Sequence, residues 1–249
     1  MIQKVFGGLA CLAAAAVWMP AQTPKSQDEI VAIQAVATAT DPDARIQAVE
    51  ALISKFKDTE FKAWAYSAAG DAAQMKRDNP KAIVYYEQAI KADPKSHNAM
   101  LMLAGVLAQS TREFDLDKEE KLNKAEKYVK SALDLIPGAV KPNPQVTDEQ
   151  WEAAKKDDVA QAHVDLGLIA TVRKKFDVAV AEYKAAVDGA SQPDAGTMIR
   201  LAGAYNDVGK PDDAIAALDK VLAIEGLNQA YKQVAEGEKA RAQKAKTAK

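Results

Sequence analysis

The residues of this chain that could do acid–base or nucleophilic chemistry are few and scattered. Its two histidines, His97 and His163, fall in different helical segments, and its single cysteine, Cys11, stands near the start. Acid–base catalysis needs titratable groups that converge on one pocket. There is no His-Glu-x-x-His pattern, glycine-rich phosphate loop, Cys-x-x-Cys pair or glycine-flanked nucleophilic serine. We therefore predict packing or capping roles for both histidines, no enzymatic activity and no cofactor.

One acidic cluster could suit a metal ion. Asp115, Asp117, Glu119 and Glu120 lie within a short stretch. A calcium loop of this kind needs an internal glycine for its turn, and this stretch has none. The preferred interpretation is a solvated loop that leads into a helix, whose acidic first turn suits the helix dipole. No metal site is predicted.

Composition indicates closely packed helices. The chain has 249 residues, of which 48% are hydrophobic, with alanine dominant, and only 6% are aromatic. We find no run of alternating β-branched and polar residues that predicts a strand. The formal net charge of −2 gives no general attraction to nucleic acid, so none is predicted as a partner.

The elements that organise the chain are clearest between residues 61 and 96. Ala82, Tyr86 and Ala89 are spaced four and three apart, which places them on one stripe of a helix. Gly70 lies mid-way along the helix before it, and Pro94 follows as a stop. Small residues at Gly70 and Ala82 let two helix backbones approach closely, and Tyr86 can fill the space beside them. Such a helix pair needs neighbours to bury its apolar face.

The same spacing starts again at Ala125, Ala179 and Ala214, with Gly167 and Ala202 as the small residues of preceding helices. With the Leu166-Gly167 pair and the Leu201/Tyr205 spacing, the chain resembles the tetratricopeptide repeat family, whose unit of about 34 residues reads W-x2-L-G-x2-Y, then A-x3-F, then P. The family tryptophan is replaced in the four units by Tyr66, Met100, His163 and Met198. The third unit has Ser191 at the proline position and the fourth has Gly226.

This resemblance implies an all-α fold, a right-handed α-solenoid of antiparallel helix pairs that winds as a superhelix. We expect repeats at 63–96, 97–140 with an insertion at 110–121, 148–193 with an extended first helix, and 195–228. Residues 22–59 form either a degenerate first helix pair or an N-terminal cap. Ala44, Ala48 and Ala51 repeat the stripe there in degenerate form. Residues 229–249 form a capping helix with a basic tail.

Function also follows from the resemblance: first helices line a concave groove that holds a peptide or protein. The predicted groove residues are Trp64, Ser67, Asp71, Gln74, Asn98, Leu101, Gln161, Val164, Leu168, Arg200 and Asn206. Trp64 either anchors a partner side chain or packs against the preceding helix. Arg200 is nearly the only basic residue of the set, which disfavours the carboxylate clamp of chaperone-binding members.

Residues 1–21 read as a secretory signal peptide. A basic start precedes an apolar, alanine-rich run that ends at Pro20 and Ala21. This favours a periplasmic or secreted protein. The alternatives are a retained inner-membrane anchor, for which the run is short, and a lipidated Cys11.

Local signals place several helix starts. Ser26 with Glu29, and Thr147 with Gln150, form capping boxes. Val146 and Trp151 are placed for a hydrophobic staple beside the second box. The insertion 138–147, with Pro142 and Pro144, predicts a non-helical loop. A helix from Asp148 to about Lys174 is either continuous or broken near Asp157.

We thus predict a non-enzymatic protein-interaction scaffold of an envelope assembly. The first alternative is a membrane-anchored assembly factor that retains its N-terminal helix. Membrane association is expected only through an uncleaved N-terminus or the basic tail. The second is a solenoid cell-wall glycosidase, which would need paired carboxylates in a deep cleft.

Overall fold

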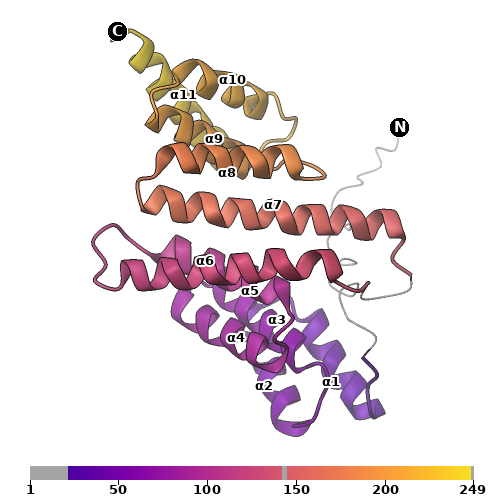
Figure 1. Ribbon diagram of the computed structural model, residues 1–249. Coiled ribbons are helices and arrows are strands. Elements are labelled where there is room, and N and C mark those ends of the chain that lie inside the picture. The colour runs from indigo at the N-terminus through magenta and orange to yellow at the C-terminus, as the bar shows by residue number, and fades with distance from the viewer. Residues whose placement is uncertain (1–21, 142–144, 248–249) are drawn as a thin grey trace, which may run out of the picture. The chain divides into compact units, whose positions relative to one another are not determined.

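The computed structural model describes residues 22–141 and 145–247, and these form helices and loops without a strand. The predicted all-α class is therefore confirmed, and Figure 1 shows the order of the helices along the chain. The described α-helices are α1 (Gln27–Thr38), α2 (Pro42–Lys55), α3 (Lys62–Met75), α4 (Asn79–Ala92), α5 (His97–Ser110), α6 (Lys118–Leu135), α7 (Asp148–Val172), α8 (Phe176–Gly189), α9 (Ala195–Asp207), α10 (Pro211–Leu222) and α11 (Gln229–Thr247).

The helices begin where side chains can satisfy their free N–H groups. The Ser26 hydroxyl accepts from the Glu29 N–H, and the Glu29 carboxylate accepts from the Lys25 N–H at 2.6 Å. At α7 the capping box is complete, because Thr147 and Gln150 each accept from the other's backbone N–H. Both predicted capping boxes are therefore present. In the first, Glu29 accepts from the N–H of Lys25, which is one residue before the N-cap Ser26.

The chain divides into two compact units. The first holds the described part of residues 1–99 together with 138–151. Its core comes from α1, α2 and α3, and centres on Val36, Val49, Leu52 and Phe61. In α2 the predicted stripe was wrong: Ala44 and Ala51 are exposed, and Ile46, Val49 and Leu52 are buried instead. The larger side chains remove more apolar area from water than alanine does, so the helix turns them inwards.

The close helix crossing expected in the first unit is present. A Cβ atom added at Gly70 of α3 would lie 2.5 Å from Cε1 of Tyr86 on α4. Tyr86 is fully buried, as are Ala82 and Ala89 on the same stripe. Glycine is needed here because a methyl group would overlap the tyrosine ring.

The second unit comprises residues 100–137 and 152–249, and its described part repeats the same packing. Gly167 on α7 meets Tyr183 on α8 with the same 2.5 Å separation from a built Cβ. Each second helix of this unit buries the predicted stripe: Ala125, Val129 and Ala132 on α6; Ala179, Tyr183 and Ala186 on α8; Ala214, Leu218 and Val221 on α10. The stripe with spacing four and three is thus the common structural element of the chain.

The long helix α7 runs unbroken from Asp148 to Val172, so of the two alternatives the continuous helix is correct. Near its end Arg173 joins it to α6, with the guanidinium donating to Glu119 at 3.0 Å, Asn123 at 2.7 Å and Glu126 at 2.7 Å. These bonds hold the extended first helix of its pair against the preceding second helix.

Some predictions fall outside the described residues. The signal peptide at 1–21, with Cys11, and the prolines Pro142 and Pro144 are among them. Among the helices of the described ranges, none is both long and apolar enough to cross a bilayer.

Candidate binding surfaces of the first helices

The first unit carries four predicted contact residues on one face of α3, and two of them are tied to α4. The Tyr86 hydroxyl donates to Asp71 Oδ1 at 2.7 Å and accepts from Gln74 Nε2 at 2.6 Å. Burial raises the pKa of the Tyr86 phenol, and the Asp71 carboxylate raises it further, so Tyr86 stays a neutral donor. Loss of hydration against the packed helices raises the pKa of Asp71, and the bond from Tyr86 opposes this rise. The pair is held in place, while the Asp71 residue still reaches solvent.

Trp64 and Ser67 complete this face. Trp64 is partly buried and packs against the core of the first unit, which supports its packing role over that of a free anchor. The Ser67 hydroxyl donates to the Ala63 carbonyl at 3.1 Å. The α3 face is therefore a polar surface of fixed side chains, with a tryptophan set into its N-terminal end.

In the second unit, Gln161 and Val164 of α7 border a cavity of about 180 Å³. Its walls come from α7, from the end of α8 and from the start of α9, and they combine aliphatic with polar side chains. The residues that line it are Asp157, Ala160, Gln161, Val164, Ala186, Ala190, Gln192, Pro193, Asp194 and Thr197. Two predicted contact residues are thus brought together with α9 around a hollow that sequence reasoning did not describe.

The remaining predicted contacts are placed differently. Leu101 and Leu168 are 1% and 8% exposed, so the free chain does not present them to a partner. Both are large apolar side chains and gain more from the core than from a surface. Asn98 is partly buried and Arg200 is exposed. Asn206 is already engaged, because its Nδ2 donates to the Glu238 side chain of α11 at 2.8 Å.

The most unusual ionisable group near this surface is Asp165, which sequence reasoning missed. It is 0% exposed, its Oδ1 accepts from Gln161 Nε2 at 2.9 Å, and its Oδ2 has no hydrogen-bond partner within the described residues. Burial raises the pKa of this carboxyl from 3.8 to about 8, although the charge of Arg200 opposes the rise. A signal was present: Ala162, Asp165 and Ile169 form a buried stripe in which the aspartate is the only polar member.

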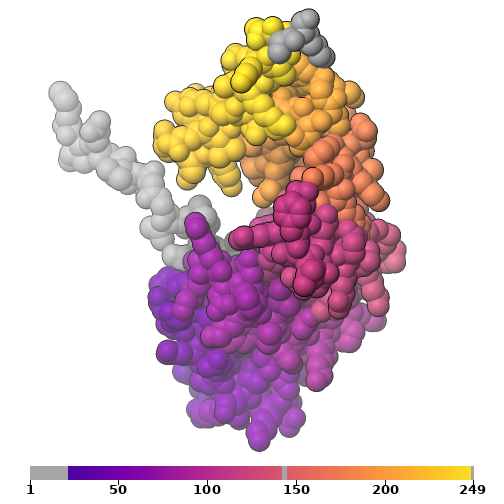
Figure 2. Space-filling model, turned by 90° about the vertical axis from the view of Figure 1, so that its left-hand side faces the viewer, coloured from indigo at the N-terminus to yellow at the C-terminus, as the bar shows by residue number. Residues whose placement is uncertain are grey.

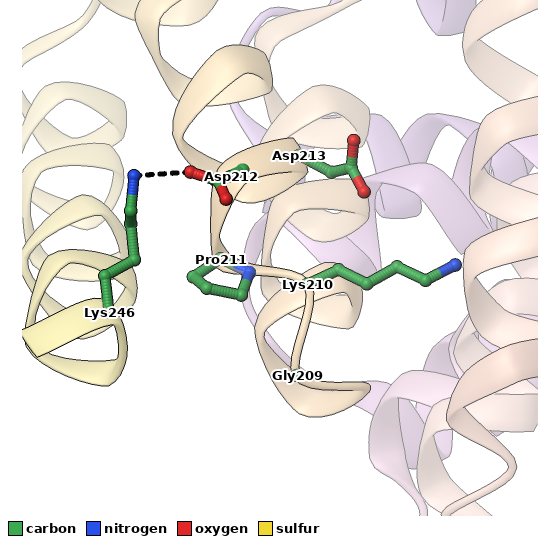
Figure 3. A pocket seen from close by; sticks show the side chains of 6 residues that line it. All are labelled: Gly209, Lys210, Pro211, Asp212, Asp213 and Lys246. Atoms are coloured by element: carbon green, nitrogen blue, oxygen red, sulfur yellow. Dashed lines mark ion pairs between the residues drawn. The ribbon is translucent and has the colours of Figure 1, made fainter. Parts of the chain in front are cut away.

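The structure brings no catalytic constellation together in the described residues. His163 Nδ1 lies 2.7 Å from Glu182 Oε2, which joins α7 to α8 as a packing contact. A hollow near the C-terminus, about 340 Å³, is bordered by the α9–α10 turn and the end of α11. Figure 3 shows Lys246 reaching Asp212 there, while Lys210 and Asp213 point to the other side. No group of three or more potential metal-ligating side chains is found in the described ranges.

Comparison with known proteins supports the family resemblance. Residues 67–139 match the sequence model of the tetratricopeptide repeat family. A solved structure of a thermophilic tetratricopeptide repeat protein from Thermus thermophilus is similar, with 16% sequence identity, a TM-score of 0.59, and coverage of 85% of this chain and 97% of that one. YrrB, a tetratricopeptide repeat protein with an unusual peptide-binding site, has 18% identity, a TM-score of 0.54, and coverage of 87% and 93%. No curated protein sequence matches the chain significantly.

The family model and these structural neighbours together support the tetratricopeptide repeat family and a fold of stacked helix pairs. At these identities the neighbours define the fold alone. Their binding properties are therefore considered only as part of a proposal.

Proposed function

We propose that this chain is a non-enzymatic scaffold that binds a peptide or protein partner on the faces of its first helices. The observation that carries the proposal is the ordered polar face of the first helix α3. Hydrogen bonds with Tyr86 of α4 fix Asp71 and Gln74 on that face, while α4 turns its apolar stripe inwards. Stacked helix-pair repeats form extended concave binding surfaces.

The similar solved structures are consistent with a peptide-binding or protein-binding role. One of them, YrrB, is described as having a peptide-binding site, although of an unusual type. The cavity beside Gln161 and Val164 has a mixed lining of aliphatic and polar side chains, and its small size suits one side chain of a bound peptide better than a whole small molecule. We propose in addition that the protein is exported to the periplasm and works in an envelope assembly, as its N-terminal sequence indicates.

Two valine variants, one on each helix of a pair, test which helix face binds. Val164 lies on the first helix and is partly buried beside a core cluster, and Val178 lies on the second helix and is 46% exposed. Affinity capture from envelope extract is compared for wild type, Val164→Arg and Val178→Arg, with circular dichroism as a check of folding. We expect Val164→Arg to lose at least about tenfold of a specific partner, because a buried interface centre tolerates a new charge poorly. Loss with Val178→Arg alone would place binding on the second helices and contradict the proposal.

A further inference from the structure

The last helix, α11, occupies a surface on α9 that the proposed function assigns to a partner. Asn206 Nδ2 donates to the backbone carbonyl of Glu238 at 3.1 Å as well as to its carboxylate. The next residue, Asp207, pairs with the Arg241 guanidinium at 2.5 Å. Figure 1 shows α11 beside α9 and α10 in the second unit.

The contacts between α11 and α9 recur at a regular interval along both helices. A Cβ at Gly196 would lie 3.5 Å from the Tyr231 hydroxyl, and one at Gly203 would lie 3.9 Å from a Glu238 carboxylate oxygen. The second contact is seven residues after the first on both helices, so α11 runs parallel to α9. It therefore stands where the first helix of a further pair would stand, and no second helix of the described residues covers it.

Ion pairs with α10 follow the same interval in the opposite direction. Lys239 pairs with Asp219 at 2.6 Å, and Lys246 pairs with Asp212 at 2.5 Å (Figure 3). We define the acidic face as Asp207, Asp212 and Asp219, together with Gly196 and Gly203, whose built Cβ atoms would be in ordinary contact with α11. This face is complementary to a basic helix with a small-residue seam.

Helix α11 buries little apolar surface. Its buried residues are Ala235 and Ala242, seven apart, whereas Tyr231 and Val234 are 46% and 52% exposed. In the space-filling view of Figure 2, α11 is the yellow surface next to the orange α9 and α10 segments. Burial of two alanines supplies little hydrophobic free energy, and exposed ion pairs add little each and are screened by salt. The helix is thus held weakly for its length.

From this geometry we propose that the acidic face is a helix-binding surface and that α11 is its displaceable internal occupant. The partner that displaces α11 is a basic helix of another protein, with alanine or glycine every seven residues and basic side chains at the same interval. This inference rests on the proposed function, because it makes the α9 face one of the first-helix surfaces that bind partners.

A peptide with the sequence of residues 229–247 is the probe. Fluorescence anisotropy measures its binding to full-length wild type and to a Lys239→Glu, Lys246→Glu variant whose own α11 is loosened. We expect the variant to bind at least about tenfold more tightly, because the intramolecular competitor is weakened. Lys232→Glu reverses one charge on α11 outside these ion pairs and should bind like wild type. Equal binding by all three proteins would overturn the proposal.

Hydrogen exchange on the wild-type chain gives a second test that needs no variant. We expect α11 amides to exchange at least about tenfold faster than those of α9 and α10, and faster still when salt rises from about 50 to about 500 mM. Equal, salt-independent protection of all three helices would show a fixed cap and overturn the displaceable occupant.

Sedimentation of wild type separates the internal occupant from a second copy of the chain. A monomer is expected, whereas a dimer would make a second copy the occupant and overturn the internal one. The capture test with Val164→Arg and Val178→Arg is independent of these results, so the two proposals can fail separately.

Discussion

At the scale of single residues, the glycine–tyrosine contacts define the structure most sharply. Gly70 and Gly167 occupy corresponding places on α3 and α7, and a built Cβ at either lies 2.5 Å from a tyrosine ring carbon. The tyrosine rings are buried and cannot move aside without disturbing the alanine stripe around them. At these two positions the packing requires glycine, because there is no room for a Cβ atom.

The first prediction compares two glycine-to-alanine changes inside helices. Gly70→Ala should lower the free energy of unfolding by about 1–3 kcal/mol, because the methyl group overpacks the crossing. Gly237→Ala on α11 is the matched control, since nothing lies within 4 Å of its built Cβ. There the usual helix preference should stabilise by roughly 0.5–1 kcal/mol. Thermal unfolding of both variants measures the difference, and a rise in Tm for Gly70→Ala would contradict the packing described.

Asp165 gives a prediction of pH dependence. Its carboxyl has an ordinary pKa of 3.8 and a folded-state pKa of about 8. Between these values the folded protein keeps a proton that the unfolded chain loses, so stability is fully present below the ordinary pKa and is lost as pH rises through the folded one. Asp165→Asn carries no such charge. It should stabilise the protein at pH 8 by on the order of 1–3 kcal/mol, and by much less at pH 4.

Urea denaturation at both pH values checks this expectation. Glu236→Gln, which removes an exposed carboxylate, is the control for the change in net charge. A stabilisation by Asp165→Asn that is the same at pH 4 and pH 8 would show that Asp165 is not titrating between them.

At the scale of elements, the sequence predicted the helices well where the signal is local. Ser26 and Thr147 accept from nearby N–H groups as expected, and the stripes that begin at Ala82, Ala125, Ala179 and Ala214 are buried. Such features depend on residues a few positions apart, which a single sequence displays directly.

Contacts between distant segments could not be predicted in the same way. Arg173 reaches three residues of α6 that lie far back in the chain, and Asn206 reaches Glu238 on α11. Nothing local distinguishes these side chains from other solvated polar residues. In the candidate surface, Gln161 was predicted as a groove contact and lies at a cavity wall, whereas Leu168 was predicted on the surface but is buried because the core competes for it.

The element-scale prediction concerns Arg173. Its side chain is 14% exposed and donates three bonds to α6. Arg173→Met should lower the free energy of unfolding by roughly 1.5–3 kcal/mol, the range for hydrogen bonds to charged groups. Lys184→Met breaks the exposed pair with Asp188 and should change the free energy of unfolding far less, because solvent screens that pair. If urea denaturation shows equal losses of stability for the two variants, Arg173 has no special role in joining α6 to α7.

At the scale of the whole molecule, the helix pair is the unit that recurs along the described chain. In the pairs α3–α4, α7–α8 and α9–α10 the second helix buries its stripe, and on α3 hydrogen bonds with Tyr86 fix polar groups at the surface. Extended binding by several such surfaces is the behaviour expected of a scaffold.

A whole-molecule prediction concerns export. If residues 1–21 are a cleaved signal peptide, mass spectrometry of protein purified from its native cells should find a mature chain that begins at Gln22. A chain that still carries its apolar N-terminal segment would favour the membrane-anchored alternative and contradict a freely periplasmic protein.

The central claim is that partners bind the first helices. Site-specific photo-cross-linking tests it directly, with a photoreactive residue placed in turn at Ser67 and Gln161 on first helices, and at Gln88 and Val178 on second helices. Both second-helix positions are exposed, which makes them fair controls for accessibility. The account predicts specific adducts in envelope extract at Ser67 and Gln161 and none at Gln88 or Val178. Adducts confined to Gln88 and Val178 would contradict it.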